Sequence, residues 1–476
     1  MRQITVRACL VIVLLLWSGM TVCWGQNGNL TDQWEEKPLI LQSGTVLVGA
    51  DAVWVPVSIL EAYLDRAFQF DKTDTRAYLS VAQPDFRLEN GALDVKILDG
   101  VTLNFMTREF NGVFYLNVYG LEPLLGLHVT TDAGGSVIIS KPQTAERRKL
   151  NTVRKKWRPQ GKINLVWDAI GTVDTDLIRQ PAIPGLQVLS PTWFSIGEDG
   201  LVSSRADIRY VKTAHQKGYK VWALVNNSFD KDLTRRILSS PYTQDRIIKQ
   251  LLVYSSLYDL DGINIDFENV YMEDKDRLTA FIARIAAALK LQGVVVSADV
   301  TVPDGSDNWS KCYDREKLAA IVDYIMVMTY DEHWAAGTKS GSVASLGWVE
   351  RGISNMLQQV PAEKLLLGLP FYTRQWAEDK NGKLAGRGKT MSMADVDKTI
   401  REKRLTPVWL ADQGQYYTEF YEQEKRHRIW LEEERSLGLK VALVDKYNLA
   451  GVASWRKGFE KETVWPVIHS GLQKSK

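Results

Sequence analysis

The sequence predicts an α/β protein whose main part is a (β/α)8 TIM barrel with an inserted lobe between strands 7 and 8, preceded by a small α+β domain. Three observations predict this fold. From residue 163 onward, apolar strand-like segments alternate with amphipathic segments of helix length. About eighty residues separate the seventh and eighth of these segments, far more than one helix requires. Before residue 141, a β-rich pattern occurs twice, about sixty residues apart.

Eight apolar segments are the predicted barrel strands. They are residues 163–167, 186–190, 221–225, 262–267, 294–298, 325–329, 365–369 and 451–454. Segments such as 278–291 have the length and the apolar face of a connecting helix. We therefore expect the barrel to span residues 163–473, and we expect strand-like pieces of the lobe around 408–409 and 428–430.

The first 25 residues predict a signal peptide. Arg2 and Arg7 precede an apolar run at 8–17, and small and polar residues follow up to Gly25. The run is too short for a comfortable membrane span, so no transmembrane segment is expected after cleavage. We expect a secreted or envelope-associated protein. Lipidation of Cys23 is an alternative, although a valine precedes this cysteine where a lipobox usually has a small residue.

A repeated unit precedes the barrel. Residues 53–64 resemble residues 113–124, and each stretch leads into a strand-like ending, so each unit is predicted to form a strand, a short helix and a hairpin. Residues 35–141 resemble the small N-terminal domain of bacterial copper amine oxidases, which recurs as a stalk or attachment module on bacterial cell-surface enzymes. The resemblance implies a wall or stalk module. Its single histidine, His128, argues against copper.

A basic segment joins the two parts. Residues 141–162 contain nine Lys or Arg and one acid, Glu146, and we interpret residues 142–162 as a linker. A solvated connector is the plain interpretation, and contact with an anionic wall polymer is the alternative. The formal net charge of the whole chain is +2, which gives no reason to expect nucleic acid as a partner. We expect a monomer.

Cysteine and histidine usage indicates neither a disulfide framework nor a metal site. Cys9 and Cys23 lie in the predicted leader, which leaves Cys312 alone in the rest of the chain. The histidines lack the spacing of metal ligands. They are His128, His215, His333, His427 and His469. We expect no metal and no cofactor, and we expect these side chains to be structural.

The fourth predicted strand carries acids. Alternate residues share a face of a strand, so Asn264, Asp266 and Glu268 point one way. Glu268 closes the strand at the end where barrel enzymes place their sites. Two residues span about 6.6 Å along a strand, so the two carboxyls can converge. Like charges this close resist joint ionisation, so Glu268 is expected to hold a proton near neutral pH, as a general acid must.

This strand resembles the signature of glycoside hydrolase family 18, the chitinase family, which reads Asp-x-x-Asp-x-Asp-x-Glu. Asp261, Asp266 and Glu268 match it, and Asn264 replaces the second aspartate. The resemblance implies substrate-assisted hydrolysis with retention, in which the N-acetyl oxygen of the substrate attacks the anomeric carbon. Glu268 would protonate the leaving oxygen and Asp266 would orient the acetamido group. Asp261 and Asn264 would be supporting residues, and the substitution at Asn264 puts the pH dependence and the rate in doubt.

Other strand ends agree with the resemblance. Residues 328–331 match the family's Met-x-Tyr-Asp, so Tyr330 is expected to bond the acetamido oxygen, with Met328 and Asp331 at the substrate. Trp455 ends the eighth strand, where the family has a tryptophan beneath the cleaved sugar. Further expected substrate contacts follow other strands, and they are Trp193, Asn226, Phe371, Tyr372, Arg374 and Trp376. For Asn226, a simple turn is an equal alternative.

Two hypotheses of different class remain. The first is a hydrolase of β-1,4-linked N-acetylglucosaminides, and the second is a non-catalytic carbohydrate-binding protein on the same fold. Retention of Glu268, Asp266 and Tyr330 favours the enzyme. Residues 367–372 and 449–456 look like the branch related to bacterial spore-germination hydrolases. That branch favours peptidoglycan as substrate, with chitin oligomers as the alternative.

Overall fold

The computed structural model describes residues 38–140 (except 43, 49–51, 65–67, 72–75, 82–88, 91–92, 95–100 and 121–126), 156–170, 177 and 179–473. The predicted signal peptide and most of the predicted linker therefore lie outside the described residues. Within these ranges, no helix has the length and apolar character needed to cross a membrane.

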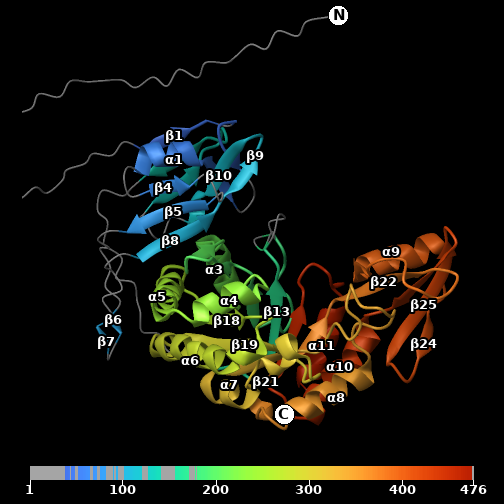
Figure 1. The fold of residues 1–476 in the computed structure, drawn as a ribbon. Coiled ribbons are helices and arrows are strands. Elements are labelled where there is room, and N and C mark those ends of the chain that lie inside the picture. Colours follow the sequence, from blue (N-terminus) through green and yellow to red (C-terminus); the bar gives the residue numbers. More distant parts are fainter. Residues whose placement is uncertain are drawn as a thin grey trace, which may run out of the picture. The chain divides into compact units, whose positions relative to one another are not determined.

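The barrel forms as predicted (Figure 1). Its strands are β13 (Ile163–Asp168), β14 (Val188–Pro191), β17 (Lys220–Asn226), β18 (Gly262–Asp266), β19 (Val295–Thr301), β20 (Tyr324–Met328), β21 (Leu365–Pro370) and β27 (Gly451–Trp455). Neighbouring strands are parallel, and β14 pairs with both β13 and β17, which closes the sheet. The strands are buried runs rich in Val, Ile, Leu and Ala, as expected for a parallel sheet covered by helices.

Helices connect the barrel strands. They are α3 (Ile208–Gln216), α4 (Lys231–Leu238), α5 (Pro241–Leu257), α6 (Lys275–Leu291), α7 (Arg315–Ile321), α8 (Leu346–Met356), α10 (Glu434–Lys446) and α11 (Val464–Gln473). The helix predicted at 278–291 lies within α6. Local sequence sets their starts: before α5, the Ser240 side chain accepts a hydrogen bond from the backbone of Thr243, and Pro241 takes the first helical position. Shorter elements in the loops are β15 (Phe194–Ile196), β16 (Val202–Ser204), η3 (Met272–Asp274), η4 (Asp307–Lys311) and η5 (Ala362–Lys364).

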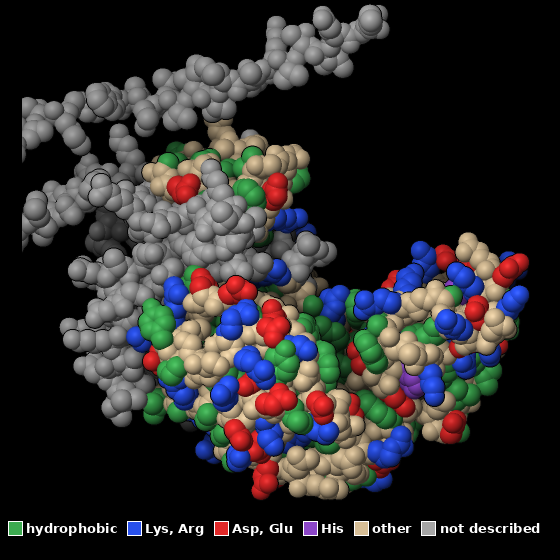
Figure 2. Space-filling view, viewed as in Figure 1, with side chains coloured by type: hydrophobic (Ala, Val, Ile, Leu, Met, Phe, Trp, Pro, Cys, Tyr) green, Lys and Arg blue, Asp and Glu red, His purple; other side chains and the backbone are tan. Residues whose placement is uncertain are grey.

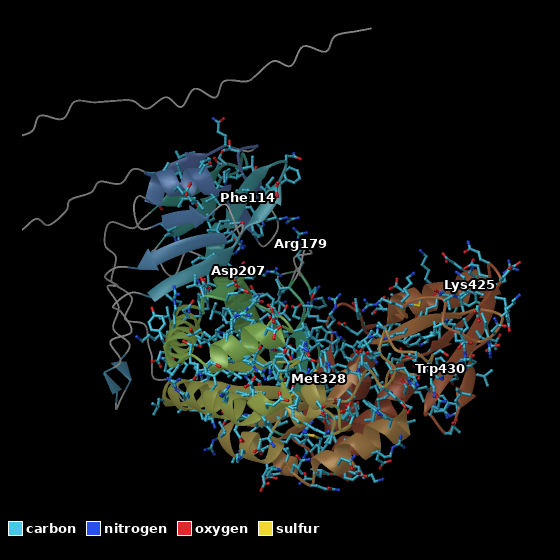
Figure 3. All side chains as sticks on the ribbon, viewed as in Figure 1. Phe114, Arg179, Asp207, Met328, Lys425 and Trp430 are labelled. Atoms are coloured by element: carbon cyan, nitrogen blue, oxygen red, sulfur yellow. The ribbon has the colours of Figure 1, made fainter. Side chains whose placement is uncertain are left out.

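The inserted lobe between β21 and β27 is an antiparallel sheet with one helix. Its elements are β22 (Tyr372–Glu378), β23 (Lys389–Ser392), α9 (Met393–Lys403), β24 (Val408–Leu410), β25 (Gln415–Glu422) and β26 (Lys425–Trp430), in the sheet order β23-β22-β26-β25-β24. Met391, Val396, Ile429 and Leu431 form a small core of its own. Figure 3 shows Lys425 and Trp430 in this lobe and Met328 in the barrel.

The N-terminal part contains both predicted repeat units. The first unit is β3 (Val53–Pro56), α1 (Val57–Leu64), β4 (Phe68–Asp71) and β5 (Arg76–Val81); the second is β10 (Val113–Asn117), η2 (Val118–Gly120), β11 (His128–Thr131) and β12 (Val137–Ser140). The remaining strands are β1 (Leu39–Leu41), β2 (Leu47–Val48), β6 (Glu89–Asn90), β7 (Leu93–Asp94), β8 (Val101–Met106) and β9 (Arg108–Phe110). Strands β3 and β10 pair with each other, so equivalent strands of the two units meet.

The described end of the predicted linker packs against the barrel. Trp157 lies edge-to-face on Trp222 of β17, with ring centroids 5.9 Å apart. Lys156 forms an ion pair with Asp323, and Lys162 donates to Asn448. Three side chains of residues 156–162 therefore contact the barrel, and residues 156, 158, 160 and 161 are exposed to solvent.

Candidate active site

The polar face of β18 points into the barrel, as its alternation predicts. Asn264 is fully buried, and its Oδ1 accepts hydrogen bonds from Trp167 Nε1 (2.8 Å) and Ser190 Oγ (3.3 Å). Its Nδ2 donates to Ser297 Oγ (3.1 Å) and Asp299 Oδ1 (2.7 Å). The buried amide is thus satisfied on both sides, which offsets the cost of placing a polar group in the core.

Glu268 stands two residues beyond the last residue of β18, which ends at Asp266. Its backbone is held by one side chain: Glu268 N donates to Asn227 Oδ1 (3.1 Å), and Asn227 Nδ2 donates to the Glu268 carbonyl (2.7 Å). Asn227 is buried and follows β17. Asn227, the residue after the expected substrate contact Asn226, therefore positions Glu268.

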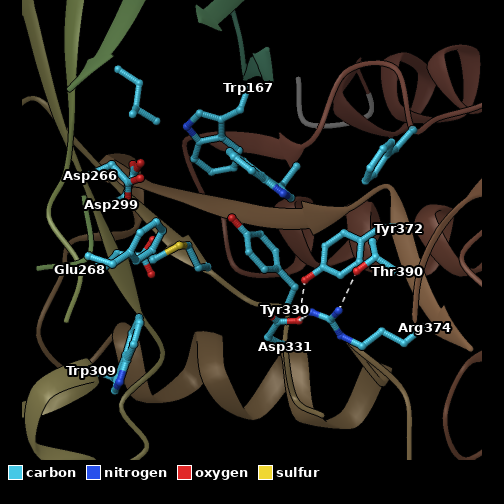
Figure 4. Close-up of a pocket in the computed structure, with 15 residues that line it drawn as sticks. Trp167, Asp266, Glu268, Asp299, Trp309, Tyr330, Asp331, Tyr372, Arg374 and Thr390 are labelled. Atoms are coloured by element: carbon cyan, nitrogen blue, oxygen red, sulfur yellow. Dashed lines mark hydrogen bonds and ion pairs between the residues drawn. The ribbon is translucent and has the colours of Figure 1, made fainter. Parts of the chain in front are cut away.

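A pocket of about 310 Å³ opens beside Glu268 (Figure 4). Its lining consists of Trp167, Leu224, Phe229, Asp266, Glu268, Asp299, Trp309, Met328, Tyr330, Asp331, Tyr372, Arg374, Thr390, Trp455 and Phe459. Figure 4 shows Asp266, Asp299 and Glu268 on one side of the pocket and Asp331, Tyr372 and Arg374 on the other. The size suits a sugar residue, and the mixture of flat rings and acids suits its apolar face and its hydroxyls.

The three acids on that side favour their protonated forms. Burial raises the pKa of Asp266 to about 7, although hydrogen bonding to Glu268 opposes the shift. Burial also raises the pKa of Glu268 well above its usual value, and the charges of Asp266 and then Asp299 add to this. Because the charge of one acid raises the pKa of another, the protonation states of Asp266, Glu268 and Asp299 depend on one another. Glu268 can therefore carry a proton at neutral pH and donate it to a bound molecule.

Asp299 on β19 belongs to this group, and the sequence interpretation missed it. Burial and the nearby charge of Asp266 raise its pKa well above the usual value, while hydrogen bonds from Asn264 and Trp167 oppose this. The predicted strand 294–298 ended before Asp299, whereas β19 extends to Thr301. The signal was present in the alternation of Ser297, Asp299 and Thr301, which follows the same rule as Asn264 and Asp266.

The opposite wall joins the barrel to the inserted lobe. Asp331 Oδ1 accepts hydrogen bonds from Tyr372 Oη (2.7 Å) and Arg374 Nη2 (2.6 Å). Arg374 also donates from Nη1 to Thr390 Oγ1 (2.8 Å). Tyr330 packs edge-to-face on Tyr372, with centroids 6.1 Å apart. The predicted residues Tyr330, Asp331, Tyr372 and Arg374 thus meet in one wall, and Thr390 joins them.

Aromatic rings form the floor and the rim. Trp455, at the end of β27, lies beside Trp167, with centroids 6.0 Å apart. At the rim, Phe229 and Trp309 lie 6.4 Å apart and remain exposed. Trp455 was predicted, whereas Trp167, Phe229 and Trp309 were not. Trp167 lies in an apolar run, which gives no signal that separates a pocket wall from a core, and Phe229 and Trp309 lie in polar segments outside the predicted strands.

Asp261 lies away from the pocket, at the amino end of β18. It accepts hydrogen bonds from His215 Nε2 (2.7 Å) and the Val221 backbone (3.0 Å), and it pairs with Lys220 (2.9 Å). Burial raises its pKa, but these partners outweigh that effect, and the net pKa lies below the usual value. Asp261 therefore stabilises the base of β17 and β18 as a charged group, and its support of the site is indirect.

Four expected substrate contacts do not line the pocket. Trp193 and Phe371 are buried against Tyr210 and Trp465, with centroid distances of 5.1 Å and 5.3 Å. Trp376 is also fully buried, and its Nε1 donates to the Gly341 carbonyl. Asn226 Oδ1 accepts from the Ser228 backbone, as in the turn that was the alternative for this residue. A position just beyond a strand does not by itself decide whether a side chain points to the pocket or to the core.

The barrel places an acid that can hold a proton at the carboxyl ends of its strands, beside an aromatic pocket of the size of a sugar. This arrangement is typical of glycoside-cleaving enzymes. The family model "Glycosyl hydrolases family 18" matches residues 191–459, and the chain belongs to this family. The fold class and the enzymatic nature predicted from the sequence are thereby confirmed.

Individual relatives agree with this family assignment. The chain is 28% identical over 298 residues to the uncharacterized glycosylase YvbX of Bacillus subtilis, covering 60% of this chain and 85% of that protein. It is 25% identical over 297 residues to the cortical fragment-lytic enzyme of Bacillus anthracis, covering 60% and 68%. The solved chitinase of Chromobacterium violaceum shares the fold, with a TM-score of 0.59 and 24% identity over 65% of this chain and 99% of that chain.

Proposed function

We propose that the protein hydrolyses β-1,4-linked N-acetylglucosaminides with retention, by substrate-assisted catalysis. The acetamido oxygen of the substrate attacks the anomeric carbon while Glu268 protonates the departing glycosidic oxygen. Water then opens the cyclic intermediate, with the Glu268 carboxylate taking the proton. The observation that carries this proposal is the pairing of Glu268 with Asp266 in the pocket, since the pair keeps a proton available at neutral pH.

Asp266 is suited to orient the acetamido group. Its Oδ1 is buried and accepts no hydrogen bond from the described residues, so it is available to an N–H of the substrate. Tyr330 and Trp455 line the same pocket and would hold the acetamido oxygen and the sugar face. Asp331 is less suited to act as a nucleophile, because its Oδ1 is held by Tyr372 and Arg374.

We infer peptidoglycan, in the cell wall or spore cortex, as the substrate. The support is the similarity to the cortical fragment-lytic enzyme and the resemblance of residues 35–141 to bacterial surface modules. On this account the chain is exported by its N-terminal signal, and residues 35–141 attach it to the envelope. Chitin oligomers are the alternative substrate, because the same chemistry cleaves them.

To test the substrate, the purified protein is incubated with peptidoglycan and with chitin oligomers. The new reducing end is identified by mass spectrometry after borohydride reduction. We expect N-acetylglucosamine at the new end of peptidoglycan fragments. Release from chitin oligomers alone would contradict the peptidoglycan assignment and leave the reaction type intact.

The catalytic test replaces one acid. Glu268→Gln keeps the shape and removes the proton, so kcat should fall by about 10³-fold or more while ligand binding persists. The matched control is Glu316→Gln, at an exposed position on α7, which should leave kcat unchanged. Full activity in Glu268→Gln would overturn the mechanism.

A further inference from the structure

A cationic hairpin lies in the chain between two pocket residues, Arg374 and Thr390. The turn between β22 and β23 carries Lys380, Lys383 and Arg387, and Lys389 begins β23; all four side chains are exposed. Thr390, the next residue, lines the pocket. The four positive charges therefore lie on the chain segment that leads directly into the proposed substrate site. Figure 2 shows Lys and Arg side chains on the lobe that carries these strands.

The two acids of this hairpin accept hydrogen bonds from other groups of the protein. Glu378 is buried and accepts hydrogen bonds from Ser340 and from Arg428 Nη1 (3.0 Å). Asp379 Oδ1 accepts from the backbone N–H groups of Asn381 (2.8 Å) and Lys383 (2.9 Å), which closes the turn. Among the described side chains, no carboxylate forms an ion pair with the four cations. Their charge faces solvent, on the segment of chain between the pocket residues Arg374 and Thr390.

The hairpin is held in place by its backbone. Gly388 N donates to the Ala335 carbonyl (2.8 Å), which ties the hairpin to the loop after β20, and Ala385 N donates to the Ala377 carbonyl (2.8 Å). Gly388 also lies against the Trp376 ring so closely that an added Cβ would stand 2.8 Å from it. The backbone that carries the four charges is therefore fixed before a ligand binds.

We propose that this hairpin, Lys380 to Lys389, binds carboxylates of the substrate, so that the enzyme prefers an anionic glycan such as peptidoglycan with its stem peptides. This inference rests on the proposed function and deepens it. A neutral chitin chain offers no partner for the four cations, whereas stem peptides carry several carboxylates near each sugar. Exposed charges act over about 8 Å at physiological salt, enough to draw an anionic polymer to the pocket.

The test compares two charge-matched variants of the full chain. One is the quadruple variant Lys380→Gln, Lys383→Gln, Arg387→Gln and Lys389→Gln. The control removes four exposed cations outside this hairpin, with Lys212→Gln, Lys249→Gln, Arg351→Gln and Arg401→Gln on α3, α5, α8 and α9. The substrates are soluble peptidoglycan fragments and the same fragments with their carboxylates capped as methylamides.

On uncapped fragments at low salt, the hairpin variant should show a KM about tenfold above that of the parent, as several weak exposed ion pairs together would give, with kcat retained. The difference should vanish on capped fragments and at high salt, and the control variant should behave like the parent. An equal loss on capped fragments, an equal loss in the control, or no change on uncapped fragments would overturn the proposal.

Failure of the proposed function is distinguishable from failure of this inference. If the parent cleaves neither substrate, the proposed function fails, and the hairpin is then judged by calorimetric binding of the two fragments to both variants. Tighter binding of uncapped fragments, lost in the hairpin variant alone, supports the carboxylate site. Equal binding of capped and uncapped fragments contradicts it.

Discussion

At the scale of the residue, the central feature is the distribution of charged groups around Asn264. The family signature has an aspartate at this position, and this chain has a neutral amide. The structure places another carboxyl, Asp299, 2.7 Å from that amide on the neighbouring strand. When Asp299 is ionised it raises the pKa of Glu268, so this carboxyl on β19 can take the electrostatic role of the aspartate that β18 lacks.

This arrangement predicts the effect of Asp299→Asn. Removing a negative charge near Glu268 favours the ionised glutamate, so its pKa falls and the alkaline limb of the kcat/KM profile moves to lower pH. The pH–rate profile measures this. Ser297→Ala removes another partner of Asn264 without changing charge and should leave the limb in place. A limb that stays fixed in Asp299→Asn, with the fold intact, would sink the positioning role.

Where a motif and a strand end coincide in the sequence, the structure brings the predicted site residues together. Asp266, Glu268, Tyr330 and Trp455 line one pocket because each combines a polar or aromatic side chain with the carboxyl end of a strand. The expected substrate contact at Phe371 rested on its position alone, and the structure buries this side chain in the core. Asn227 was not recognised as a positioning residue because its partners are backbone atoms, which leave no trace in sequence spacing.

At the scale of the element, Arg374 joins the end of β20 to the inserted lobe. It is almost fully buried and bonds Asp331 on one side and Thr390 on the other. Lysine has no planar fork and cannot make both bonds in the same geometry. The pocket wall therefore depends on one guanidinium.

Arg374→Lys should lower the free energy of unfolding by about 1–3 kcal/mol and raise KM about tenfold. Urea unfolding and steady-state kinetics measure the two effects. Arg426→Lys is the matched control in the same lobe, since its pair with Glu419 is partly exposed and worth little. Unchanged stability and KM in Arg374→Lys would show that the wall holds without this link.

The sequence predicted the barrel strands well, because buried parallel strands are long apolar runs separated by helices. The strands of the inserted lobe were harder to predict. Of its five strands, β24 and β26 were indicated, whereas β22 and β23 follow directly from the seventh barrel strand and a Gly- and Lys-rich turn. Short antiparallel strands outside the main core depend on their partners, and single-chain periodicity does not reveal those partners.

At the scale of the whole molecule, the buried acids link stability to pH. The pKa of Asp266 rises from the ordinary 3.8 to about 7 on folding, so the folded state holds a proton that the unfolded state releases. The contribution is therefore fully present below about pH 4 and is lost as the pH rises through about 7. Asp266→Asn removes this dependence.

We expect Asp266→Asn to unfold near the parent temperature at pH 4 and several degrees above it at pH 8 to 9, a rise of about 2–4 °C per kcal/mol. Calorimetry across this pH range measures it. Asp276→Asn, at an exposed site on α6, should follow the parent throughout. A melting temperature for Asp266→Asn below that of the parent at pH 8 would contradict the assignment of a raised pKa to Asp266.

The proposed mechanism requires that the acetamido oxygen of the substrate attacks the anomeric carbon while Glu268 donates its proton to the leaving oxygen. The most direct measurement compares kcat for aryl β-glycosides that carry N-acetyl or N-trifluoroacetyl groups. Fluorine withdraws electrons from the acyl oxygen, so the account predicts a steep fall in kcat for the trifluoroacetyl substrate. An equal kcat for the two substrates would mean that a protein carboxylate or water attacks the anomeric carbon instead, and the proposed mechanism would be wrong.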